Sequence, residues 1–140
     1  MKLFFYGVLM GEVAPPRVQA MLRGIGPGEP ASMRGLLYAV ADPEGAHPAM
    51  IPGEGVVHGR LHAAGRVDLA ALDAFEGYDP ANPTAGEYRR EAVTVRCADG
   101  REAQAEAYFW NRPVDERLSP IAGGDFAAWL AESGLRPIGS

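Results

Sequence analysis

Two alternating stretches, residues 88–97 and 102–110, constrain the fold of this 140-residue chain more than any other feature. Between them lies Asp99-Gly100, a dipeptide typical of tight turns in β-hairpins. In the second stretch, small alanines share one face of the predicted strand, and the bulky Tyr108 and Trp110 lie on the other. Small residues opposite bulky ones indicate a curved sheet, which we expect to close into a small barrel.

The rest of the chain predicts several more strands and three short helices, segregated rather than alternating along the sequence. The apolar run 3–6 is typical of a central strand that is covered on both faces. Residues 49–51 lie between Pro48 and Pro52, so we expect a short, separate strand at a sheet edge. Further strands are predicted within 32–42 and 56–62, and loops at 26–30, 79–87 and 111–124. One helix has Pro15-Pro16 in its first turn and stops at Gly24, a second lies within 68–77, and a third is capped by Asp125 and followed by Gly134. This arrangement predicts an α+β fold with a single domain over residues 1–140.

Composition and charge narrow the class of protein. The formal net charge is −5 and the basic residues are scattered, which argues against nucleic acid or an anionic membrane as a partner. The single cysteine, Cys97, excludes an intramolecular disulfide and fits a reducing compartment. The N-terminal apolar run is short and lacks a small-residue cleavage site, and no stretch reaches transmembrane length. We therefore expect a cytoplasmic protein, and the sequence leaves its oligomeric state open.

The segment 68–79 predicts a helix that carries a carboxylate in its apolar stripe. Asp68 suits the N-cap, and Gly77 suits the left-handed position that ends a helix. Glu76 falls between Leu69 and Leu72 on the helical wheel, whereas Asp73 falls at the edge of the stripe. Burial would raise the pKa of Glu76 and make it a usable acid or base near neutral pH. The alternative is a glutamate whose head group reaches water from the end of the helix.

Two other segments could form a binding site. In Tyr6-Gly7-Val8-Leu9, a glycine that leaves a central strand lets successive backbone amides converge on an anion such as a carboxylate. The alternative is a plain turn that ends the strand. The predicted hairpin carries an aromatic and basic set that could orient a polar substrate at a barrel mouth, or could serve for packing and surface charge. This set consists of Tyr88, Arg89, Arg90, Tyr108 and Trp110.

The histidines and the cysteine predict no catalytic or metal site. His58 and His62 lie on one side of their strand and His47 lies in a loop, and neither spacing resembles a metal site. We expect them to be surface residues or polar residues with satisfied hydrogen bonds. Cys97 ends a strand on an apolar face without an evident partner base, so we expect a small core residue.

Taken together, these motifs resemble the gamma-glutamylcyclotransferase-like family, in its AIG2-like branch. The resemblance covers nearly the whole chain, and the order of its motifs is more specific than any one of them. The matching segments are Tyr6 to Leu9, Pro48 to Gly53, Val57 to Gly59, Leu72 to Gly77, Tyr88 to Arg90, Val93 to Val95 and Ala107 to Trp110.

The resemblance implies a small mixed β-barrel with flanking short helices and a cavity at its mouth. It also implies an enzyme, a lyase or transferase in the broad sense, that cyclises a small-molecule gamma-glutamyl substrate to 5-oxoproline and releases an amine or amino acid. Glu76 matches the family's acid/base, and the turn from Tyr6 to Leu9 matches the segment that holds the glutamyl end through backbone amides. Tyr88 and Tyr108 are expected to bind substrate at the mouth. This chemistry requires no metal, cofactor or covalent intermediate.

Two positions depart from the family's pattern. Val8 stands where the family often has Ser or Thr, and Met10 stands where it often has a polar or basic residue. Both positions bear on substrate identity, and they favour the alternative of a non-catalytic small-molecule binding module on the same fold. Glu76 within the apolar stripe favours the enzyme.

Overall fold

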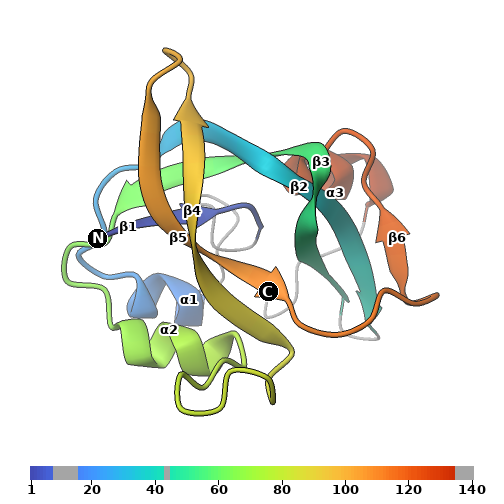
Figure 1. The fold of residues 1–140 in the computed structure, drawn as a ribbon, viewed down its shortest axis with the longest axis horizontal. Coiled ribbons are helices and arrows are strands. Elements are labelled where there is room, and N and C mark those ends of the chain that lie inside the picture. Colours follow the sequence, from blue (N-terminus) through green and yellow to red (C-terminus); the bar gives the residue numbers. More distant parts are fainter. Residues whose placement is uncertain (8–15, 43–44, 135–140) are drawn as a thin grey trace.

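A computed structural model describes residues 1–7, 16–42 and 45–134 of the chain (Figure 1). These residues form six strands and three helices. The strands are β1 (Lys2–Phe5), β2 (Glu29–Asp42), β3 (Gly45–Ala63), β4 (Tyr88–Cys97), β5 (Glu102–Trp110) and β6 (Leu118–Pro120), and the helices are α1 (Pro16–Met21), α2 (Leu69–Phe75) and α3 (Phe126–Ser133).

The sheet closes on itself into a five-stranded mixed barrel. Its strand order is β3-β1-β5-β4-β2, and β2 pairs again with β3, while β6 adds to β2 from outside the ring. The β1–β5 pair is parallel and the other pairs are antiparallel. The expected α+β barrel with short flanking helices is therefore confirmed.

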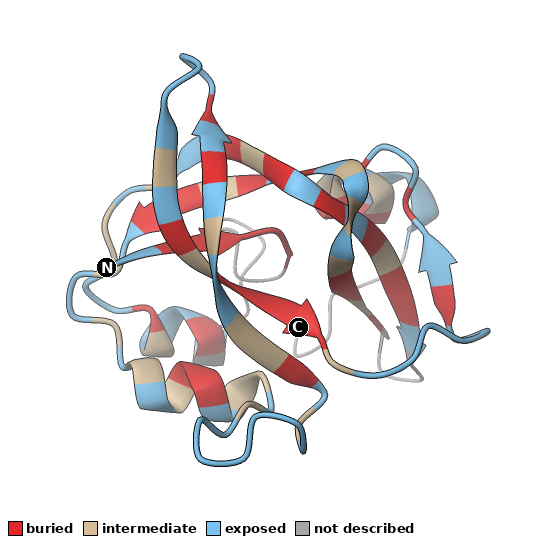
Figure 2. Ribbon diagram, in the orientation of Figure 1, coloured by how far each residue is buried: buried red, intermediate tan, exposed pale blue. Residues whose placement is uncertain are grey.

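The β4–β5 hairpin has the predicted bounds and turn. Its register runs without a break from Tyr88 opposite Trp110 to Arg96 opposite Glu102, and Gly100 in the turn has a φ of +89°. In β5, the alanines at 105 and 107 are buried together with the last three aromatic residues. This end of β5 is paired along both edges, with β1 and β4, and Figure 2 shows it as buried.

Three expected boundaries are wrong. The sequence predicts two strands on either side of Pro52, but β3 is one strand of 19 residues. The register passes from Leu36 opposite Ile51 to Arg34 opposite Val56, so Pro52 lies in a bulge where no ladder hydrogen bond is required of it. In addition, β2 begins at Glu29, inside a predicted loop, and β6 lies inside the segment that was expected to be irregular.

Helices α2 and α3 begin and end at the predicted signals. The side chain of Asp68 caps α2 by accepting from the N–H of Ala71 at 3.1 Å, and Asp125 caps α3 by accepting from Ala128 at the same distance. Gly134 ends α3 with a φ of +72°. Figure 1 places α1 and α2 at one end of the barrel and α3 with β6 at the other. In the described part of the chain, each helix is too short or too polar to cross a bilayer.

Candidate active site

The carboxyl end of α2 fixes the position of Glu76. Glu76 is the C-cap residue, and Gly77 follows it with a φ of +72°. The N–H of Gly77 donates to the carbonyl of Ala74 at 3.1 Å, and the N–H of Tyr78 donates to the carbonyl of Asp73 at 2.8 Å. These two bonds form a Schellman motif, which satisfies the last helical carbonyls and holds the backbone of Glu76 in one conformation.

The surroundings of Glu76 favour its protonated form. Its side chain is half-buried. Burial, and after it the charge of Asp73, raise the pKa of Glu76 from 4.5 to about 8. A carboxyl group with this pKa exists in both protonation states near neutral pH.

Three tyrosines share this region with Glu76. Burial raises the pKa of Tyr6, Tyr88 and Tyr108 above the usual 10.0, and in each case the charge of Glu76 contributes. Coupling between charges weakens with distance, so the three phenols and the carboxylate lie within one electrostatic neighbourhood. The raised pKa keeps all three hydroxyl groups protonated at neutral pH.

The residue that leaves β1, Gly7, packs closely against β3. A Cβ at Gly7 would lie 2.2 Å from the Cγ of Pro48, so this approach requires glycine. The hydroxyl of Tyr88 donates to the carbonyl of Pro48 at 2.5 Å and lies 2.7 Å from Nδ1 of His47. The ring of Tyr88 also packs edge-on against Trp110, with centroids 5.4 Å apart. Gly7, the second residue of the predicted binding turn, therefore packs against the ring of a proline whose carbonyl accepts a hydrogen bond from Tyr88.

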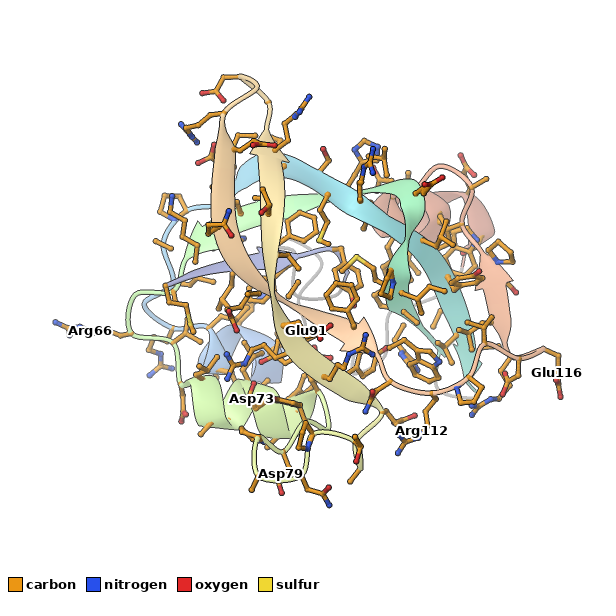
Figure 3. The ribbon with its side chains drawn as sticks, viewed as in Figure 1. Arg66, Asp73, Asp79, Glu91, Arg112 and Glu116 are labelled. Carbon is orange, nitrogen blue, oxygen red and sulfur yellow. The ribbon has the colours of Figure 1, made fainter. Side chains whose placement is uncertain are left out.

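An ion pair joins α2 to the hairpin beside Glu76. Asp73 is 5% exposed and lies between α2 and the strands in Figure 3. Arg90 donates to its two oxygens through Nε at 3.0 Å and Nη2 at 3.3 Å, and to Glu106 through Nη1 at 2.8 Å. The hydroxyl of Tyr108 donates to Oδ1 of Asp73 at 2.6 Å, and its carbonyl accepts from the hydroxyl of Tyr6. These bonds tie α2 to β4 and β5, and through Tyr108 to the end of β1.

Of the residues expected to act on substrate, Tyr6 and Tyr108 are hydrogen-bonded to each other, and Tyr108 also bonds Asp73, one turn before Glu76. The charge of Glu76 contributes to the raised pKa of Tyr6, Tyr88 and Tyr108. Gly7 follows directly after Tyr6, whereas Val8, Leu9 and Met10 lie outside the described residues. On the helical wheel Asp73 falls at the edge of the apolar stripe, and the sequence leaves the role of Arg90 open. Their pairing joins two elements distant in sequence, although the one-turn spacing of Asp73 and Glu76 indicated a shared helix face.

His47 lies in β3 and not in a loop as expected, and its Nδ1 is 2.7 Å from the hydroxyl of Tyr88. His62 is buried, its Nδ1 lies 2.8 Å from the carbonyl of Gly26, and its Nε2 has no hydrogen-bond partner among the described residues. Cys97 is buried as expected, and Nη2 of Arg101 lies 3.2 Å from its sulfur. Within the described parts of the chain, no three His, Cys, Asp or Glu side chains are grouped so that they could hold a metal ion.

Comparison with known proteins agrees with this fold. Residues 3–128 match the family model for gamma-glutamyl cyclotransferase, AIG2-like proteins. The gamma-glutamylcyclotransferase family protein YtfP of Escherichia coli is 34% identical over 86 residues, 61% of this chain and 63% of that protein. The match therefore spans less than two thirds of that relative.

Two solved structures share the architecture at low sequence identity. YkqA from Bacillus subtilis superposes with a TM-score of 0.67 at 22% identity, over 95% of this chain and 42% of that one. An AIG2-like protein from Mus musculus superposes with a TM-score of 0.65 at 22% identity, over 89% of this chain and 86% of that one. At this level of identity the likeness shows the fold.

Proposed function

This chain belongs to the gamma-glutamyl cyclotransferase, AIG2-like family, and on that premise we propose that it is a cyclotransferase. It converts a gamma-glutamyl amine, peptide or amino acid to 5-oxoproline and a free amine, with Glu76 as the general acid/base. The single observation that supports this most is a half-buried carboxyl group whose pKa is raised to about 8, within the electrostatic neighbourhood of three phenols where β1 ends.

The reaction requires protons to cross from one nitrogen to another. The substrate's α-nitrogen attacks its own γ-carbonyl carbon, a C–N bond of the new five-membered ring forms, and the C–N bond to the leaving amine breaks. Of the three protons of the α-ammonium group, one stays on the ring nitrogen and two end on the released amine. The Glu76 carboxylate accepts a proton from the attacking nitrogen and returns it to the leaving nitrogen, at a typical benefit of ~10²–10⁴-fold in rate. No step of this scheme uses a metal ion or cofactor.

The phenols and the turn after β1 would hold the substrate. Because Tyr6 donates its proton to a backbone carbonyl, its hydroxyl oxygen is left to accept from the substrate's ammonium group. We propose Tyr6, Tyr88 and Tyr108 as substrate-binding side chains, and Gly7, Val8 and Leu9 as the source of backbone amides for the glutamyl end. Holding the attacking nitrogen close to the γ-carbonyl is where pre-organisation contributes most to a ring closure.

A panel of gamma-glutamyl compounds tests the proposal. The purified protein is incubated with gamma-glutamyl amines, dipeptides and amino acids, and 5-oxoproline is measured by mass spectrometry. We expect release from at least one class and a loss of at least ~100-fold in Glu76→Gln. Glu102→Gln is the matched control, since Glu102 is exposed and pairs weakly with Arg96 at 3.9 Å.

The outcomes separate the candidate functions. Turnover that is equal in the parent and in Glu76→Gln would remove Glu76 from its assigned role. If no compound is turned over but some bind, the protein is a small-molecule binding module on this fold. A cytoplasmic location is part of the same proposal because the single Cys97 fits a reducing compartment, and cell fractionation tests it.

A further inference from the structure

Two carboxylates on α2 differ in what surrounds them. Asp73 precedes Glu76 by three residues, so both project from nearly the same side of the last helical turn. Asp73 is 5% exposed and Glu76 is half-buried. Asp73 is therefore more buried than Glu76, the proposed acid/base. The hydrogen-bond donors around Asp73 explain how its carboxylate is accommodated there.

The donors around Asp73 occupy both of its oxygens. Oδ1 accepts from Nε of Arg90 at 3.0 Å and from the hydroxyl of Tyr108 at 2.6 Å, and Oδ2 accepts from Nη2 of Arg90 at 3.3 Å. The guanidinium approaches both oxygens and supplies the opposite charge that a buried carboxylate needs. Arg90 is itself held by Glu106 at 2.8 Å and lies 5.7 Å from the ring centre of Tyr78. Asp73 thus has donors on both of its oxygens, one turn before Glu76.

We infer that Asp73, held by Arg90 and Tyr108, is a positioning residue for Glu76. Its bonds anchor the end of α2 to the hairpin, and they hold its carboxylate one turn from the proposed acid/base. This inference rests on the proposed function, because Glu76 needs such support only if it moves protons during a reaction.

The electrostatic surroundings support the inference. Ionisable groups whose pKa shifts involve Glu76 come from four elements or their ends: Asp73 on α2, Tyr6 after β1, Tyr88 on β4 and Tyr108 on β5. The three phenols are neutral near pH 7, so the charge of Asp73 is the one that disfavours ionisation of Glu76. Glu106 pairs with Nη1 of Arg90 and is not among the groups that shift the pKa of Glu76.

Carbon-detected NMR titration of the carboxyl groups tests the inference without relying on activity. In Asp73→Asn, the pH midpoint of the Glu76 titration curve should fall from about 8 by roughly one pH unit. Glu106→Gln removes a negative charge from the same network and should leave the midpoint unchanged. In an active parent, the acid limb of the kcat/KM profile should move with the Glu76 midpoint.

A second variant provides the same test if Asp73→Asn alone does not fold. Asp73→Asn leaves Arg90 short of a partner, so Asp73→Asn with Arg90→Met removes both members of the pair, and it should lower the midpoint in the same direction. An unchanged midpoint in the folded variants, or an equal fall in Glu106→Gln, would overturn the inference. If neither variant folds, the parent is titrated alone: a Glu76 transition near its ordinary 4.5 overturns the inference, and a transition near 8 supports it.

The same data separate this inference from the proposed function. If the parent turns over no gamma-glutamyl compound, the function fails while the titrations still report on Asp73. If the parent is active and the midpoint does not move in Asp73→Asn, the function stands and the role of Asp73 is wrong.

Discussion

Replacing Glu76 with glutamine should make the protein more stable at alkaline pH than the parent. The glutamine has nearly the same shape but carries no charge at any pH. In the parent, burial and the charge of Asp73 raise the pKa of Glu76 from 4.5 to about 8, so ionised Glu76 opposes folding. The substitution removes that opposition, and its effect on the free energy of unfolding should depend on pH.

The size of the effect follows from linkage. Below pH 4 the carboxyl group is protonated in both the folded and the unfolded chain, and it contributes no pH dependence. Between 4.5 and about 8, a span of about 3.5 pH units, the unfolded chain releases the proton while the folded chain retains it. Each pH unit then lowers the stability of the parent by about 1.4 kcal/mol, up to about 5 kcal/mol in all. Because Glu76 is only half-buried, we expect about 2–4 kcal/mol after allowing for solvent screening.

Urea denaturation of both proteins at pH 4, 6, 7.5 and 9 measures this difference. The quantity of interest is the change in the variant-minus-parent free energy of unfolding between pH 4 and pH 9, since contributions from other groups cancel. We expect this difference to increase with pH and to level off above pH 8. Parallel pH profiles for the two proteins would refute the reasoning, because they would place the Glu76 carboxyl group in a water-like environment.

Three further substitutions test the packing of the site. Tyr88→Phe removes the donor to the carbonyl of Pro48 and the partner of His47, so the free energy of unfolding should fall by about 1–3 kcal/mol, and unchanged stability would contradict the buried geometry. Gly77→Ala forces a Cβ onto a residue with a φ of +72° and should cost about 1 kcal/mol, whereas a gain in stability would mean that this φ is wrong. Gly7→Ala places a Cβ 2.2 Å from the ring of Pro48 and should cost about 1–3 kcal/mol; adding Pro48→Ala should recover part of this loss, and simple additivity in a double-mutant cycle would argue against the contact.

The local features of the sequence determined the elements that depend on local physics. Alternation and the Asp99-Gly100 turn predict the β4–β5 hairpin with its observed bounds, because side-chain period and turn conformation act within a few residues. Asp68 and Gly77 predict the ends of α2 for the same reason. The apolar stripe of this helix also indicated Glu76 as a carboxylate of interest, and the resemblance to the family gave it a role.

The tertiary structure decided what depends on contacts between distant segments. Pro52 predicts a break between two strands, but a bulge opposite β2 lets β3 continue through it, and this requires knowing the partner strand. The helical wheel places Asp73 at the edge of the stripe, yet it is the most enclosed carboxylate of α2, because Arg90 and Tyr108 reach it from the hairpin. A buried charge is stable only beside its partners. Arg90 and Tyr108 reach Asp73 because barrel closure brings β4 and β5 next to α2. The hydrophobic pattern of one helix contains no information about that contact.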